Sequence, residues 1–157
     1  MRHFISITIC ILTVISSFAQ VSLCDNTYVW DFCRDDGRKV TLTENFTLDF
    51  EEEFIRRGCT VLQRRNFGNL AAQSENEKSI HSLKDSNPNI EQSLKEIEAK
   101  SVIFGIVSLD SYHDVYSVYV TFEHLETKQI LKSYRLFISK LDADLDELRR
   151  KAVRKCD

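Results

Sequence analysis

The most regular feature of the chain is an alternation of apolar and polar positions in "VYSVYVTFEHLETKQILKSYRLFIS", residues 115–139. In the first half of this stretch the apolar side chains fall on every second residue, which is the period of a strand with one buried face. These residues are Tyr116, Val118, Val120 and Phe122. The turn-forming run "LETKQ" separates this segment from a second one, "ILKSYRLFIS", so the pattern predicts a β-hairpin.

A second pattern has the spacing of a helix. From Thr43 onward, Phe46, Phe50 and Phe54 recur every four residues, and Gly58 follows as a helix stop. Burial of each phenylalanine contributes about 1.5–3 kcal/mol to folding. We therefore expect this stripe to fix the helix against a sheet.

The last predicted helix, 141–156, also carries apolar residues at helical spacing, and these predict its buried face. They are Leu141, Leu145, Leu148, Ala152 and Cys156. The segment "SVIFGIVSL", 101–109, is apolar on both faces, as expected for a strand that is covered on both sides. Gly105 in its middle predicts the close approach of another group.

The remaining segments complete a regular order of elements. Strands are predicted at 27–34 and 59–65, and helices at 66–73 and 89–100. The order is strand, helix, strand, helix, helix, strand, strand, strand, helix. This order favours an α/β fold, an α+β sandwich built on a mixed five-stranded sheet.

The N-terminal residues have the layout of a secretory signal peptide. A short basic start precedes the apolar run 4–15, and small residues offer a cleavage site after Ala19. We therefore expect a signal peptide at 1–19 and a single domain at 20–157. A lipidated Cys24 is an alternative, and it is the one way in which we expect the chain to be attached to a membrane.

Charge and motifs limit the functions that the chain can have. Lys and Arg number 21 against 24 Asp and Glu, and no basic stripe is present, so nucleic acid is excluded as a partner. His81, His113 and His124 lie in no catalytic or phosphate-binding motif. We therefore expect a non-enzymatic protein that has no cofactor and no metal site.

The cysteines of the predicted domain are Cys24, Cys33, Cys59 and Cys156. Parallel early strands with right-handed crossovers place all of these except Cys33 at one end of the sheet. Bridged Cα atoms lie within about 7 Å of each other. We therefore expect a disulfide from Cys59 to either Cys24 or Cys156, and a buried free thiol at Cys33.

Three segments resemble a family of bacterial envelope proteins. They are "FEEEFIRRGCTVLQRRNFGNLAAQ", similar to its helix, short strand and helix; "IEAKSVIFGIVS", similar to its buried strand with a central glycine; and "YSVYVTFEHLETKQIL", similar to its hairpin. The family is that of the curli-production assembly/transport component, CsgG-like, with relatives among the lipoprotein activators of penicillin-binding proteins and the N-terminal domain of the Tol–Pal translocation protein. The resemblance covers most of 27–156. The chain departs from it at His124 and Lys128, where relatives have aspartate and glycine.

The resemblance implies a CsgG-like domain that is exported to the periplasm or the outer membrane, or otherwise secreted. Channel-forming members carry long inserted hairpins, and a transmembrane strand needs about 9–11 residues. The connections "DSYHD" and "LETKQ" are much shorter than that. We therefore expect no transmembrane pore.

The resemblance and the lack of catalytic motifs together favour an exported binding or assembly module whose partner is another envelope protein. We expect the partner surface on the last hairpin, at Tyr119, Lys132 and Arg135, and on the loop 109–114, because tyrosine and arginine are frequent interface anchors. The alternative is a structural subunit that assembles with itself into a homo-oligomer. A small secreted hydrolase ranks third.

Overall fold

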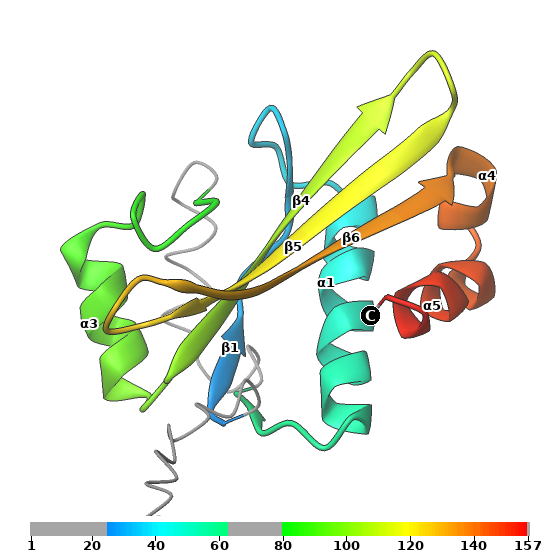
Figure 1. The fold of residues 1–157 in the computed structure, drawn as a ribbon. Helices are drawn as coiled ribbons and strands as arrows, with labels where there is room; N and C mark the ends of the chain where they lie inside the picture. The colour runs from blue at the N-terminus through cyan, green and yellow to red at the C-terminus, as the bar shows by residue number, and fades with distance from the viewer. Residues whose placement is uncertain (1–24, 63–79, 157) are drawn as a thin grey trace, which may run out of the picture.

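A computed structural model describes residues 25–62 and 80–156. The predicted helix 66–73 and the predicted cleavage and lipidation sites lie outside these residues. The elements (Figure 1) are β1 Thr27–Val29, β2 Cys33–Arg34, α1 Thr41–Arg56, β3 Val61–Leu62, α3 Pro88–Glu96, β4 Ser101–Asp110, β5 Val115–His124, β6 Ile130–Ser139, α4 Lys140–Ala143 and α5 Asp146–Arg154.

The strands form the mixed sheet that the sequence predicts, in the order β3-β1-β4-β5-β6, with β2 also paired to β4. β1 is parallel to β3 and β4, whereas β5 is antiparallel to both of its neighbours, β4 and β6. The predicted hairpin 115–139 is therefore confirmed as β5 and β6. Both strands are ten residues long, as is β4, and these three form the extended part of the sheet (Figure 1).

The predicted first strand, 27–34, is two short strands in the structure. Trp30 still donates its backbone N–H to the carbonyl of Ile103 in β4, at 2.8 Å. Two residues later, the backbone N–H of Phe32 donates to the hydroxyl of Thr47 on α1, at 2.9 Å, and not to a strand. The chain thus leaves the sheet between β1 and β2 because a helix side chain supplies the hydrogen bond.

The sheet carries one apolar cluster on each face. The first lies between the sheet and helices α1 and α5, and it contains Phe46, Phe50 and Phe54, which confirms the predicted stripe. The second lies on the opposite face, under α3 and the segment before it. Gly105 faces the first cluster, where the ring of Phe32 lies so close that a Cβ at this glycine would be 2.3 Å from the ring carbons. The predicted close approach at Gly105 is confirmed.

The C-terminal segment corrects the sequence prediction. It forms two helices, because Ser139 caps α4 through the N–H of Asp142, at 3.1 Å, and the chain turns again before α5. Leu141 is 73% exposed and Leu145 is 50% exposed, so the predicted leucine stripe does not form the buried face. The buried face of α5 carries Arg149 and Val153, while Ala152 and Cys156 of the predicted stripe do pack against the core.

Arg149 is buried because its charge is neutralised by α1. Its guanidinium donates to the Asp49 carboxylate at 2.6 Å and to the backbone carbonyl of Ala143 at 3.2 Å. Arg150 donates to the other oxygen of the same carboxylate at 3.2 Å. Burial nevertheless raises the pKa of Asp49 above its usual value, despite the lowering effect of the two arginines. This ion pair joins α5 to α1.

Candidate interaction surface

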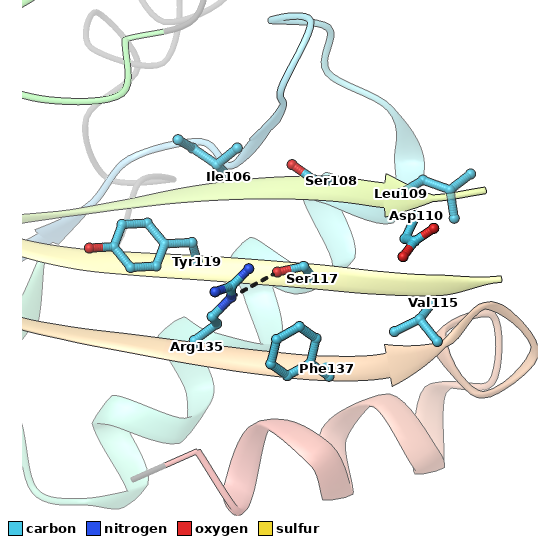
Figure 2. Close-up of a pocket in the computed structure, with 9 residues that line it drawn as sticks. All are labelled: Ile106, Ser108, Leu109, Asp110, Val115, Ser117, Tyr119, Arg135 and Phe137. Carbon is cyan, nitrogen blue, oxygen red and sulfur yellow. Dashed lines mark hydrogen bonds between the residues drawn. The ribbon is translucent and has the colours of Figure 1, made fainter. Parts of the chain in front are cut away.

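One half of the extended sheet is left open on the face that α3 packs against. The apolar cluster under α3 includes Val102 and Phe104 of β4 but no later residue of that strand. Beyond Phe104, side chains of β4, β5 and β6 line a hollow of about 490 Å³ (Figure 2). Its residues are Ile106, Ser108, Leu109, Asp110, Val115, Ser117, Tyr119, Arg135 and Phe137, and we call them the open face. Within the described ranges, no helix is packed over the open face.

The open face is built around a fixed arginine. Arg135 lies opposite Tyr119 in the β5–β6 register. Its guanidinium lies 4.9 Å from the ring centre of Phe137, and its Nε donates to the hydroxyl of Ser117 at 3.3 Å (Figure 2). The stacking and the hydrogen bond hold the side chain along the sheet and leave most of its donors available. The face therefore presents a preorganised cation between two aromatic rings.

The structure brings together two of the three predicted surface residues. Tyr119 and Arg135 are neighbours on the open face, whereas the Lys132 ammonium lies 4.5 Å from the ring centre of Tyr134, which belongs to the cluster on the other face of the sheet. Lys132 and Arg135 are three residues apart, so strand alternation already places them on opposite faces. Of the three residues named from the sequence, Tyr119 and Arg135 thus share one face and Lys132 lies on the other, and their role in binding stays a prediction.

Phe137 is the residue that the sequence analysis missed. It follows Arg135 by two residues and is 61% exposed, while Tyr119 is 41% exposed. The signal was present, because the same alternation that places Leu136 and Ile138 inside places Phe137 outside. An exposed phenylalanine beside a tyrosine and an arginine marks this surface more clearly than any single residue does.

The predicted loop 109–114 contributes an exposed hydrogen-bonded pair of side chains at the edge of the open face. The ring of His113 lies 2.7 Å from the carboxylate of Asp110, and this hydrogen bond lowers the pKa of Asp110. Both side chains are largely exposed, and only Asp110 lines the hollow. The pair therefore lacks the enclosure that an acid–base site requires.

The other histidine contacts do not assemble a nucleophile. The ring of His81 lies 3.3 Å from the sulfur of Cys33, which is a buried free thiol, as predicted. Burial raises the pKa of this thiol to about 11, so the reactive thiolate is not formed at neutral pH. Within 25–62 and 80–156, no group of three or more metal-ligating side chains is present.

The structure excludes one of the two partners predicted for Cys59. Cys156 carries a thiol, which leaves Cys24 as the candidate partner of Cys59. Cys24 lies outside the described residues, so this pairing stays a prediction.

In the part of the chain that the structure describes, no helix has the length and apolarity needed to cross a bilayer.

Solved structures share this fold although sequence comparison finds no relative. No protein-family model and no curated protein matches the chain. The lipoprotein GNA1162 of Neisseria meningitidis is 12% identical, with 74% of this chain and 80% of that one aligned and a TM-score of 0.57. The LpoB C-terminal domains of Escherichia coli and Salmonella enterica are 10% and 9% identical, each over 73% of this chain and 82% of that one, with TM-scores of 0.53 and 0.50. The chain therefore has the fold of the LpoB C-terminal domain and of GNA1162, as the sequence resemblance implied.

Proposed function

We propose that this chain is an exported, non-enzymatic protein of the bacterial envelope that binds a partner protein through the open face. The observation that carries the proposal is the cluster of Tyr119, Arg135 and Phe137 around a hollow on a rigid antiparallel sheet. The role is recognition without turnover: the sheet presents anchor side chains, and the partner fills the hollow between them.

The chemistry of the cluster supports this role. Tyrosine and arginine are among the residues that contribute most to binding at protein interfaces. Arg135 is already held by Phe137 and Ser117, so binding it does not require the ordering of a free side chain, which typically costs about 0.5–1.5 kcal/mol. We therefore expect truncation of Tyr119 or Arg135 to weaken partner binding by about 2 kcal/mol each.

The proposed location rests on two observations. The fold is that of a protein described as a lipoprotein, and the N-terminal residues have the pattern of a signal peptide that ends shortly before Cys24. A periplasmic or outer-membrane-associated protein, or otherwise a secreted one, fits both. Mass spectrometry of the mature N-terminus tests this directly, since a lipid on Cys24 adds a defined mass.

Site-specific photocrosslinking tests the binding role. A photoreactive amino acid replaces Tyr119 or Phe137 in the full chain expressed in its host. The matched control position is Leu48, which is 50% exposed on α1. We expect one defined envelope protein to crosslink at the two sheet positions and not at the control, and the Arg135→Ala substitution to reduce that product. Equal labelling at all three positions, or no product at the sheet positions, would reject the open face as the binding surface.

A further inference from the structure

The outer edge of β6 is an unpaired strand edge. β6 is the last strand of the sheet and pairs with β5 alone among the described strands. Its register with β5 is regular from Lys132 to Ser139, since the register shift lies opposite its beginning, at Phe122 and Glu123 of β5. No further backbone hydrogen bond of the described chain reaches these β6 residues. A long regular edge of this kind is a template for another extended chain.

A groove runs along this edge. A hollow of about 660 Å³ is lined on one side by the consecutive residues 135–139 of β6. On its other side lies one face of α5, which turns back after α4 and lies beside the end of the strand (Figure 1). The lining residues on this side are Leu148, Lys151 and Ala152 of α5 and Lys155, which caps its C-terminal end. Because five successive strand residues line it, the groove follows the backbone edge and not one face of the sheet.

The groove is basic in a chain that is acidic overall. Three of its lining residues are cations (Arg135, Lys151 and Lys155) and only Asp142 is an anion, whereas the whole chain has a net charge of −3. None of these three cations forms an ion pair with a described residue. Apolar surface lies between the charges, because Phe137 and Leu148 are 61% and 37% exposed. The groove thus offers backbone donors and acceptors, apolar side chains and positive charge.

We infer that the β6 edge binds an extended segment of a partner protein in which acidic and apolar residues alternate, added to the sheet as a further strand. This inference rests on the proposed binding function and names its partner chemistry. Alternate residues of a strand are about 6.8 Å apart, and residues four apart on a helix rise by about 6 Å. Two successive acidic side chains of the added strand therefore match the spacing of Lys151 and Lys155, and its backbone pairs with β6.

The charges argue against a second copy of the chain in this groove. A second copy paired along β6 would add its own Lys132 and Arg135 to a groove that already carries Arg135, Lys151 and Lys155. Like charges that face each other across strands are destabilising. The cations of the groove attract an acidic partner, whereas they repel the cations of a second copy.

A designed peptide tests the inference on the purified chain. The probe is a fluorescein-labelled heptapeptide of alternating glutamate and valine. One control peptide has lysine in place of glutamate, and two others carry N-methyl groups on alternate backbone nitrogens, one set for each edge of the strand. Fluorescence anisotropy measures binding, and hydrogen exchange measures protection of the β6 amides. The variant is Lys151→Glu, and its matched control is Lys84→Glu, an equal charge change at an exposed residue outside the groove.

The acidic peptide is expected to bind and to protect those amides of residues 132–139 that do not already donate to β5. Lys151→Glu is expected to weaken binding about five- to tenfold, because it replaces an attraction with a repulsion, and Lys84→Glu less than about twofold. One N-methylated peptide should lose binding. Strand addition is overturned if the lysine peptide, or both N-methylated peptides, bind as well as the acidic peptide. It is also overturned if the acidic peptide does not bind at about 1 mM.

Two results separate this inference from the proposed function. Crosslinking at Tyr119 without peptide binding keeps the open face as a binding surface and rejects strand addition. Protection of the outward-pointing β6 amides without peptide, together with a dimer mass in light scattering, assigns the edge to a second copy and also rejects the inference.

Discussion

Gly105→Ala is the substitution for which the structure gives the sharpest expectation. The new Cβ would lie 2.3 Å from Cδ2 and Cγ of the Phe32 ring, whereas carbon atoms in contact prefer about 3.5–4.0 Å. Phe32 cannot move aside, because it is fully buried and its ring centre lies 5.4 Å from that of Phe50. Overpacking of this kind costs about 1–3 kcal/mol, and removal of a glycine from the unfolded chain returns about 0.4–1 kcal/mol. We expect a net loss of about 1–2 kcal/mol in the free energy of unfolding, measured by urea titration.

A double-mutant cycle identifies the cause of that loss. Phe32→Ala alone should cost about 3–5 kcal/mol, because it opens a cavity in the core. In the Phe32→Ala background the added methyl group meets no ring, so Gly105→Ala should cost nothing further, and the two substitutions should be coupled by about 2 kcal/mol. Gly58→Ala is the control: Gly58 has a φ of 84° and no atom near its Cβ position, so alanine there should be destabilising through the backbone without coupling to Phe32. Unchanged stability of Gly105→Ala, or coupling below about 0.5 kcal/mol, would refute the reasoning.

Three further predictions concern the buried charges and the cysteines. Arg149→Met should reduce the free energy of unfolding by about 3–5 kcal/mol, because it leaves the buried Asp49 without its main partner. In urea titrations, the double variant that also carries Asp49→Leu should recover most of this loss. If it recovers none, the unpaired charge of Asp49 is not the cause. The hydrogen bond from Arg56 holds the pKa of Glu53 below its usual value of 4.5. The stabilisation of the fold by ionised Glu53 is therefore complete above pH 4.5, and it is lost as the pH falls through the lowered pKa. Glu53→Gln should therefore cost about 1–3 kcal/mol at neutral pH and progressively less in acid, and a deficit that does not change with pH would contradict this. Peptide mapping without reductant should recover a Cys24–Cys59 link, and mapping that finds Cys59 bridged elsewhere would exclude the predicted pairing.

The sequence determined the elements whose signals are local. The hairpin follows from a period of two, which fixes which side chains share a face, and the phenylalanine stripe of α1 follows from the helical period. The start of α3 is equally local: the Asn87 side chain accepts hydrogen bonds from the backbone N–H groups of Asn89 and Ile90, and Pro88 fits the first helical position. Even the close contact at Gly105 was predictable, since a glycine in a buried strand usually marks one.

Only the tertiary structure decided where these elements are interrupted and what they leave uncovered. The first strand divides because Thr47, on another element, takes the hydrogen bond of Phe32. The predicted leucine stripe is exposed because the chain breaks between α4 and α5 and turns Arg149 toward Asp49. The open face and the groove beside β6 depend on how far neighbouring elements reach across the sheet. Local periodicity reports which side of an element is apolar, but burial depends on partners that are distant in sequence, and no pattern within one segment contains that information.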